Sequence, residues 1–563
     1  MSRNADGLSG KLLAATLILG LSGCTTATGP APAALGGDAP AGQPKVNRLV
    51  MGLPPPVSEV QDAANGPQAW PLRPMYENLL GFEATTGKLA PQLATEWAYD
   101  ATAMTMTYAL RKGVQFHGGF GEFTAGDVEG SWSAYVNRPV TAAVGEGVTY
   151  FKEVTSRVEV VDPYKVVFHL TRPDAFFLRA HSEDDNTIMM FSKAHFQKAG
   201  YPQSLKDQPL TGTGPYQYQS REQAVNVRFE RPPFKHWSGA GPDFPEFEYR
   251  WMKEASTRLA ALLAGEVQVT SLPQDLTQSA LQKGMKAING RVKGFRSGMR
   301  YLCCFLKDPK DLENTKGLVD DPLNDVRVRR ALDKAIDRDA LNKAFLGGKG
   351  ELQVVPHFEP NRQGWNPDWV KRFADEYGYD PAKARSLLAE AGYGPGKPLR
   401  MTLFATPTGG VAGGEADMVE AINTYWRAAG IDVDFSQTDG AQITTLSRSG
   451  NLTGAAQLRG TSASQFSAIQ LFDSYGFGGG FRGYLFDRDL NKAFAPLVTT
   501  VESEKQEGLY RQIGEILFTH HNEIPLFWLP TEAIVNPAFV ADYVFPGALT
   551  GTWTHVQNIK AAR

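Results

Sequence analysis

Residues 416–435, ADMVEAINTYWRAAGIDVDF, change from the period of a helix to the period of a strand within one short stretch. Apolar side chains recur every three or four positions up to Ala429, which is typical of a helix with one buried face. Gly430 provides a helix stop, and residues 431–435 then alternate between apolar and polar side chains, as in a strand. A helix that leads directly into a strand predicts a mixed α/β fold.

Two segments before this stretch are also predicted to be helical. Either Asn324 or Asp325 can cap a helix whose apolar stripe continues to a stop at Gly347-Gly348. Asp380 is a natural N-cap, Pro381 suits the first helical position, and Gly392 provides the stop of a second helix. The second half of the chain is therefore expected to alternate helices with strands.

The first third of the chain has the pattern of strands instead. Side chains alternate over residues 104–111, and the run VEVVDPYKVVFHL (158–170) predicts a hairpin that turns at its Asp-Pro pair. Gly212 and Gly214 in TGTGPY (211–216) predict a tight turn before a further strand. We expect a strand-rich first lobe followed by an α/β second lobe.

Composition excludes several classes of protein. The 563 residues carry 57 basic and 60 acidic side chains, a net charge of −3 that gives no electrostatic basis for binding nucleic acid. A hydrophobic content of 42% is enough for large cores, which excludes disorder as the main state. No apolar run approaches the roughly 20 residues of a membrane-spanning helix, so we expect no polytopic membrane protein.

The N-terminal segment has the features of a targeting signal. Residues 1–23 contain two basic side chains and the short apolar run LLAATLILGL (12–21), which predicts a signal peptide. The sequence Leu-Ser-Gly-Cys that ends at Cys24 resembles a bacterial lipobox, so we expect cleavage before Cys24 and its lipidation. An ordinary secretory signal with an incidental cysteine is the alternative. Residues 24–45 are rich in Ala, Gly and Pro and predict a flexible tether, with the folded body beginning near Val46.

Sequence motifs of catalysis are largely missing. The chain has no G-x-S-x-G, H-E-x-x-H or G-x-x-x-x-G-K-[ST] pattern. Residues 478–483 match G-x-G-x-x-G by spelling, but no buried strand precedes them and no helix begins within them, so we interpret them as a loop. We therefore expect no catalytic residues, no metal site and no cofactor.

Two further cysteines, Cys303 and Cys304, lie in the apolar run YLCCFL (301–306). They are too few for a disulfide framework or a four-ligand zinc site. They are interpreted either as a vicinal disulfide or as two small buried apolar residues. If the run is a strand, one of the two side chains faces the opposite side from the other.

Several blocks of sequence follow one another in a recognisable order. They are MYENLLGFEATTGKLAPQLATEWAYD (75–100), LRKGVQFHGGFGEFTAGDVEGSW (110–132), VVDPYKVVFHLTRP (160–173), TGTGPYQYQ (211–219), STRLAALLAGEVQV (256–269), DDPLNDVRVRRALDKAIDRDAL (320–341), YDPAKARSLLAEAGY (379–393), AAGIDVDF (428–435) and NEIPLFWLP (522–530). Together they resemble the family 5 extracellular solute-binding proteins of ABC transporters, the group with dipeptide-, oligopeptide- and nickel-binding members.

This resemblance implies a two-lobed periplasmic-binding-protein fold of the large peptide-binding type, with a subdomain inserted in the first lobe. The implied domains are a discontinuous lobe I of residues 46–72, 208–302 and 524–563, an inserted subdomain of residues 73–207, and lobe II of residues 303–523. The segments that cross between the lobes are expected near residues 299–305 and 524–527.

The resemblance also implies a function. A small solute, either a peptide or another peptide-like or non-peptide ligand, would bind between the lobes and be delivered to an ABC permease with separate ATPase subunits. The protein would be a monomeric, non-enzymatic lipoprotein in the periplasm or on the outer face of the cell membrane. One alternative is a solute-sensing lipoprotein receptor that has no role in import, and another is an exported hydrolase.

The nature of the ligand is harder to predict. Peptide-binding relatives typically carry a G-W-x-A-D-Y-like segment whose Asp pairs with the peptide ammonium group, and the corresponding region here, residues 458–487, lacks it. This absence favours a non-peptide ligand. The charged, polar and aromatic residues that could line the site are Cys303, Phe305, Arg459, Thr461, Phe466, Asp473 and Tyr475. Each of them could equally be a packing or loop residue.

Overall fold

The computed structural model describes residues 44–563 with gaps. The gaps are residues 57–58, 60, 87, 138–150, 175–176, 184–187, 200–208, 240, 292, 294, 309, 312, 361, 406–414, 439, 463–484, 501–502, 530 and 548–553. The chain divides into two units, Met1–Gly42 and Gln43–Arg563. The predicted signal peptide and Cys24 lie outside the described residues, as do Phe466, Asp473 and Tyr475.

A seven-stranded sheet collects strands from distant parts of the chain. Its order is β12-β19-β11-β1-β10-β9-β8. The strands are β1 (Arg48–Leu53), β8 (Gln217–Glu222), β9 (Asn226–Glu230), β10 (Glu246–Trp251), β11 (Val269–Thr270), β12 (Lys286–Asn289) and β19 (Glu532–Val535). The central β1 is almost wholly buried and pairs in parallel with both β10 and β11, as expected for an apolar run covered on both faces. Helices α5 (Ala255–Ala264) and α6 (Gln274–Gln282) follow β10 and β11.

A four-stranded antiparallel sheet is formed within the predicted inserted subdomain. Its order is β4-β5-β7-β6, with β4 (Ala94–Asp100), β5 (Thr105–Leu110), β6 (Thr155–Asp162) and β7 (Lys165–Leu170). The predicted strand and the predicted hairpin are both confirmed. Helix α1 (Ala125–Val136) packs on β6 and β7 and begins with a capping box formed by Thr124 and Asp127. The short elements β2 (Leu80–Phe82), β3 (Leu89–Pro91), α3 (Phe177–Ala180) and α4 (Lys193–Ala199) complete this region.

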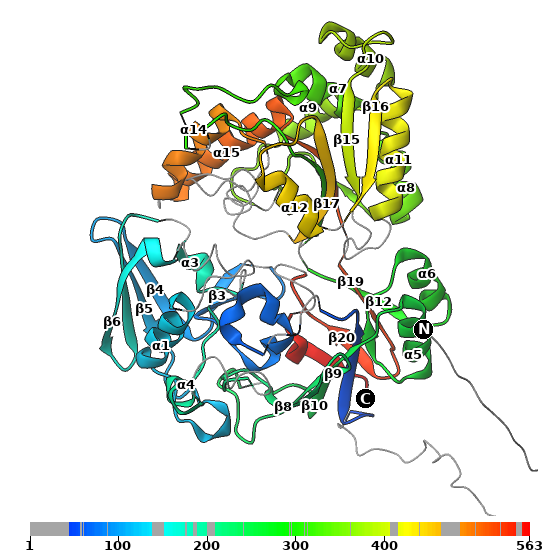
Figure 1. The fold of residues 1–563 in the computed structure, drawn as a ribbon. Coiled ribbons are helices and arrows are strands. Elements are labelled where there is room, and N and C mark those ends of the chain that lie inside the picture. Colours follow the sequence, from blue (N-terminus) through cyan, green and yellow to red (C-terminus); the bar gives the residue numbers. More distant parts are fainter. Residues whose placement is uncertain are drawn as a thin grey trace, which may run out of the picture. The chain divides into compact units, whose positions relative to one another are not determined.

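A six-stranded sheet with order β14-β18-β13-β17-β15-β16 forms the α/β part of the chain. Its strands are β13 (Phe295–Tyr301), β14 (Glu351–Leu352), β15 (Arg400–Ala405), β16 (Asp432–Gln437), β17 (Ala455–Ser462) and β18 (Glu523–Trp528). The accompanying helices are α7 (Val326–Lys334), α8 (Arg338–Leu346), α9 (Asp368–Tyr377), α10 (Pro381–Glu390), α11 (Glu415–Ala428), α12 (Gly440–Arg448), α14 (Arg488–Thr499) and α15 (Ser503–His520). Helix α11 packs along β15 and β16, so the predicted mixed α/β fold is confirmed (Figure 1).

Further elements lie near the two ends of the described chain. A 3-10 helix, η1 (Ala63–Met75), follows β1, and the C-terminal strands β20 (Val540–Tyr543) and β21 (Ile559–Ala561) form an antiparallel pair. Among the described residues, no helix combines the length and the apolar character needed to cross a membrane.

The chain passes twice between the seven-stranded and six-stranded sheets. It leaves β12 after Asn289 and enters β13 at Phe295, and it returns from β18 after Trp528 to β19 at Glu532. The links are therefore residues 290–294 and 529–531. The crossings predicted near 299–305 and 524–527 fall in or beside β13 and β18, which pair within the six-stranded sheet.

The helix predicted to run from Asp325 to Gly347 is instead two helices. Asp325 does cap α7, but α7 ends at Lys334 and α8 begins at Arg338. The Asp337 carboxylate accepts a hydrogen bond from the Ala340 amide at 2.9 Å and so caps α8. The apolar period continues through the break, which is why periodicity alone missed it.

A buried histidine in the four-stranded region makes stability depend on pH. His181 has no solvent exposure, and its Nδ1 lies 3.2 Å from the Tyr108 hydroxyl group. Burial lowers the pKa of His181 to about 3, whereas the same side chain titrates near 6.5 in an unfolded chain. The unfolded state therefore binds more protons as the pH falls below about 6.5, and the folded state is destabilised.

We expect this group to remove about 2 kcal/mol from the free energy of unfolding between about pH 7 and about pH 5. Urea unfolding of the wild type and of His181→Gln at both values measures it. The variant should lose about 2 kcal/mol less than the wild type over this interval, because Gln does not titrate. An equal loss in both proteins would contradict the prediction.

Candidate functional site

Strand β13 presents charged side chains on one face and apolar side chains on the other. Met299 and Tyr301 belong to the main hydrophobic core of the six-stranded sheet. Because neighbouring residues of a strand point to opposite faces, Arg296, Gly298 and Arg300 share the other face. Arg296 is 1% exposed and Arg300 is 9% exposed, so two guanidinium groups are buried on this face.

Glu523 of β18 supplies the carboxylate that pairs with Arg296. Both side chains are almost fully buried, and Arg296 donates to the carboxylate through both terminal nitrogens. Gly298 follows Arg296 by two residues on the same face of β13. A Cβ at that position would be 2.5 Å from Glu523 Oε1. Glycine at 298 therefore leaves the space in which the carboxylate reaches the guanidinium group.

His357 completes this buried cluster. Its Nε2 accepts a hydrogen bond from Arg296 Nη2 at 3.1 Å and lies 3.7 Å from Glu523 Oε2. Burial, reinforced by the charge of Arg296, lowers the pKa of His357 to about 4, so the ring is neutral at pH 7. Burial alone would raise the pKa of Glu523, but the charge of Arg296 holds it well below its ordinary value.

Two of the predicted site residues lie beside this cluster. Strand β17 pairs with β13 so that Arg459 stands opposite Gly298 and Thr461 stands opposite Arg296. Arg459 is exposed, whereas Arg296 and Glu523 are buried. Arg459 and Thr461 therefore lie on the strand next to the buried charged residues of β13. We call Arg296, Glu523 and His357 together the Arg296–Glu523 cluster.

The other predicted residues in the described chain are not exposed. Cys303 and Phe305 are 0% and 2% exposed, and both lie after the end of β13. The strand argument used for the cysteines is therefore wrong, since Cys304 has a left-handed backbone with φ of 59°. Each of the two interpretations left open by the sequence describes part of the structure. Cys303 and Cys304 are buried, and they are also joined as a vicinal disulfide.

The sequence analysis did not identify Arg296, Arg300, His357 or Glu523. The pattern R-x-G-x-R at 296–300 is a signal that could have indicated a charged strand face. The partners Glu523 and His357 had no such signal, because they come from distant segments.

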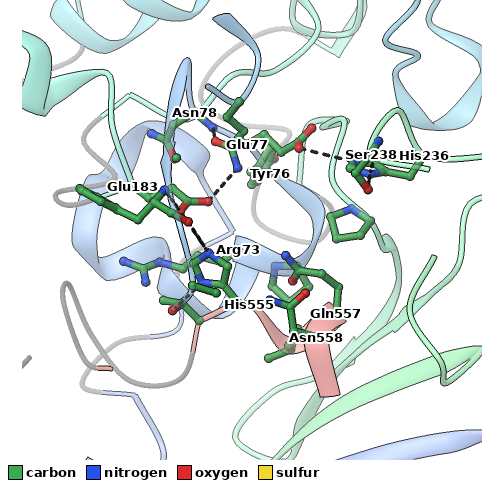
Figure 2. A pocket seen from close by; sticks show the side chains of 18 of the residues that line it. Arg73, Tyr76, Glu77, Asn78, Glu183, His236, Ser238, His555, Gln557 and Asn558 are labelled. Carbon is green, nitrogen blue, oxygen red and sulfur yellow. Dashed lines mark hydrogen bonds and ion pairs between the residues drawn. The ribbon is translucent and has the colours of Figure 1, made fainter. Parts of the chain in front are cut away.

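A second polar site is a cavity of about 370 Å³ beside the seven-stranded sheet (Figure 2). It is lined by residues that follow η1, by β2 and β3, by the segment between β9 and β10, and by residues 554–560. None of the predicted site residues lines it. Its members come from so many separate segments that no local sequence pattern could have predicted it.

Two acidic side chains of this cavity are held by hydrogen bonds. The Glu77 carboxylate accepts from the Thr213 hydroxyl at 2.7 Å and from Trp237 Nε1 at 2.8 Å. The Glu183 carboxylate accepts from Gln92 Nε2 at 2.7 Å. Both carboxylates therefore already have protein partners, and they position the walls of the cavity.

Two groups of described residues bring three potential metal ligands together, which the sequence analysis did not predict. One consists of Asp487, Asp489 and His520, and the other of Cys303, Cys304 and Asp321. In the first group, His520 Nδ1 lies 2.7 Å from Asp487 Oδ2 at the end of α15. His520 is the last residue of α15.

Comparisons with known proteins place this fold among binding proteins. The structure of HbpA2 from Haemophilus parasuis superposes with a TM-score of 0.71 and 22% identity, over 92% of this chain and 100% of that chain. The chain therefore has the two-lobed fold of the large periplasmic binding proteins.

The family follows from the sequence match. Residues 88–482 match the model of the bacterial extracellular solute-binding proteins, family 5 Middle, and the chain belongs to this family. It is 32% identical over 375 residues to the dipeptide-binding protein of Escherichia coli (strain K12), which covers 64% of this chain and 65% of that protein. It is 27% identical over 479 residues to heme-binding protein A of Haemophilus influenzae, over 81% of each.

Proposed function

We propose that the protein is the solute-binding subunit of an ABC importer and that it delivers a captured small solute to a membrane permease. The observation that carries this proposal is the family match over residues 88–482. The relatives are named as binding proteins, which supports binding without catalysis. The two short links at 290–294 and 529–531 support a hinge, because only they connect the two large sheets in the described chain.

We place the lobe boundaries of this proposal at those links. Lobe I then contains the seven-stranded sheet, lobe II contains the six-stranded sheet, and the four-stranded sheet belongs to the inserted subdomain. The solute binds between lobes I and II. A lipid on Cys24 and the tether of residues 24–45 hold the protein at the outside of the cell membrane or in the periplasm.

The solute class proposed here is a small anion, either a peptide-like molecule or another carboxylate. Arg459 is exposed on β17, and a guanidinium group pairs with carboxylates through two parallel hydrogen bonds. The Arg296–Glu523 cluster lies in register beside it and supports the strand with a rigid, buried network. The missing G-W-x-A-D-Y-like segment agrees with recognition that does not depend on a peptide ammonium group.

Thermal and urea unfolding of residues 43–563 with candidate solutes tests this function. Di- to pentapeptides, opine-like amino-acid conjugates, sugars and metal chelates would be compared. A true ligand at about 100 times its dissociation constant should raise the free energy of unfolding by about 2.7 kcal/mol. The increase should be confined to solutes that carry a carboxylate.

Arg459→Gln should weaken the response to the same solute about tenfold or more, as expected for a lost charge-assisted hydrogen bond. The matched control is Arg400→Gln, since Arg400 is also a strand residue of this sheet and its side chain is 84% exposed. A solute that stabilises wild type and Arg459→Gln equally would refute the role of Arg459. Failure of every solute class would refute the proposed function.

A further inference from the structure

One cluster of side chains has no role in the proposed function. The sulfur atoms of Cys303 and Cys304 and a carboxylate oxygen of Asp321 all lie within 4.8 Å of one another. The three side chains are buried, with Asp321 only 5% exposed. Two sulfurs and one carboxylate oxygen are a set of atoms that binds metal ions in other proteins.

Within the described residues, the buried carboxylate of Asp321 is held by backbone amides. It accepts hydrogen bonds from the Leu323 amide at 2.8 Å and from the Gly454 amide at 3.0 Å, and a third comes from the Cys304 amide. Within the described part of the chain, no basic side chain forms an ion pair with it. A cation bound nearby would relieve the cost of this buried charge.

The cluster lies at the base of a surface loop. The segments on either side of the loop pair through the Val319 amide and the Phe305 carbonyl at 2.8 Å, and through the Lys307 amide and the Gly317 carbonyl at 3.1 Å. Lys307 is exposed, so the chain reaches solvent a few residues beyond the cysteines. Local opening of this loop gives an ion a path to the cluster.

We propose that reduction of the Cys303–Cys304 disulfide creates a binding site for a soft divalent cation such as Zn²⁺ or Cd²⁺, with both sulfurs and the Asp321 carboxylate as ligands. Thiolate sulfur prefers such ions, and three protein ligands leave one coordination position for water. In the oxidised protein the two sulfurs are bonded to each other and offer no thiolate.

The reduction is a thiol–disulfide exchange with an external dithiol. The dithiol supplies two electrons and two protons, the bond between the Cys303 and Cys304 sulfurs breaks, and two thiols form while the dithiol becomes a disulfide. Metal binding then releases both thiol protons to solvent.

Cd²⁺ titration of residues 43–563, which lack Cys24, tests this proposal. The protein is measured by its ultraviolet sulfur-to-cadmium absorption, before and after treatment with a dithiol that is then removed without air. A thiol assay should find no free thiol before treatment and two after it. Only the reduced protein should show the sulfur-to-cadmium absorption, and this absorption should saturate at one ion per chain.

Two variants separate the ligands from their surroundings. Asp321→Asn should weaken Cd²⁺ binding by the reduced protein about tenfold or more, whereas Asp320→Asn, the exposed neighbouring carboxylate, should leave it unchanged. Cys303→Ser should abolish the sulfur-to-cadmium absorption of a two-thiolate site. Circular dichroism checks that each reduced protein remains folded. If Asp321→Asn or Cys303→Ser unfolds, the comparison uses the one of these two variants that stays folded.

Three results would overturn the proposal. One is the finding of two free thiols in the untreated protein, because metal binding would then not depend on reduction. Another is a folded, reduced protein with two thiols that does not bind Cd²⁺. The last is equal Cd²⁺ affinity of wild type, Asp321→Asn and Asp320→Asn, which would show adventitious binding by surface carboxylates. None of these results bears on solute binding, since the test uses no solute.

Discussion

Replacing Glu523 by Gln should lower the free energy of unfolding by about 3–5 kcal/mol, the loss typical of a buried ion pair that loses one partner. Arg296 is 1% exposed and Glu523 is 2% exposed, so water cannot replace the missing carboxylate charge. The neutral amide also cannot accept as strongly from the guanidinium nitrogens that now bond to the carboxylate. Urea unfolding at about pH 7 measures the change.

An exposed ion pair provides the control. Asp368 and Lys371 on α9 are 60% and 77% exposed, and Asp368→Asn should change the free energy of unfolding by less than about 1 kcal/mol. A double variant, Arg296→Met with Glu523→Leu, removes both charges and should be much more stable than Glu523→Gln. If the single variant loses no more than the exposed control, the buried pair does not carry the stability assigned to it here.

Gly214→Ala should cost about 3 kcal/mol, at the upper end of what overpacking usually costs. A Cβ at this position would lie 2.7 Å from the Pro74 carbonyl oxygen and from the Met75 carbonyl carbon. The two backbones cannot separate easily, because the Gly214 amide donates to the Met75 carbonyl at 2.9 Å and the Tyr216 amide donates to the Pro74 carbonyl at 3.0 Å. The new methyl group would break these hydrogen bonds or distort the chain.

The same substitution at Gly396 is the matched control. A Cβ there has no atom within 4 Å, and its backbone is not left-handed, so Gly396→Ala should be neutral or slightly stabilising. Chemical unfolding of both variants beside the wild type gives the comparison. Similar free energies for Gly214→Ala and Gly396→Ala would mean that the contact with residues 74–75 is not tight.

Local patterns predicted local structure well. The hairpin with its turn at Asp162 and Pro163 and the helix between Asp380 and Gly392 are both present, because each depends on residues close in the chain. The break between α7 and α8 was missed, although Asp337 is a good N-cap, because the apolar stripe continued across it. Sheet order was not predictable, since β18 lies beside β13 although the two strands are far apart in sequence.

The candidate site shows the same division. Sequence comparison with a family directed attention to Arg459 and Thr461, and the register of β17 then placed them beside Arg296 and Gly298. Arg296, Glu523 and His357 come from three segments, and no local pattern links them. The cysteines were noticed for their adjacency, but only the folded chain placed Asp321 next to their sulfur atoms.

The sequence alone determined the family, the mixed α/β class and the positions of the helices and strands whose signals are local. Only the tertiary structure showed why particular residues are needed at several of those positions. Gly212 and Gly214 were interpreted as a turn, yet neither needs a left-handed backbone; both are required because the chain at residues 74–76 passes too close for a side chain. Close approach and burial depend on which distant segments pack together, and this is set by the free energy of the whole fold.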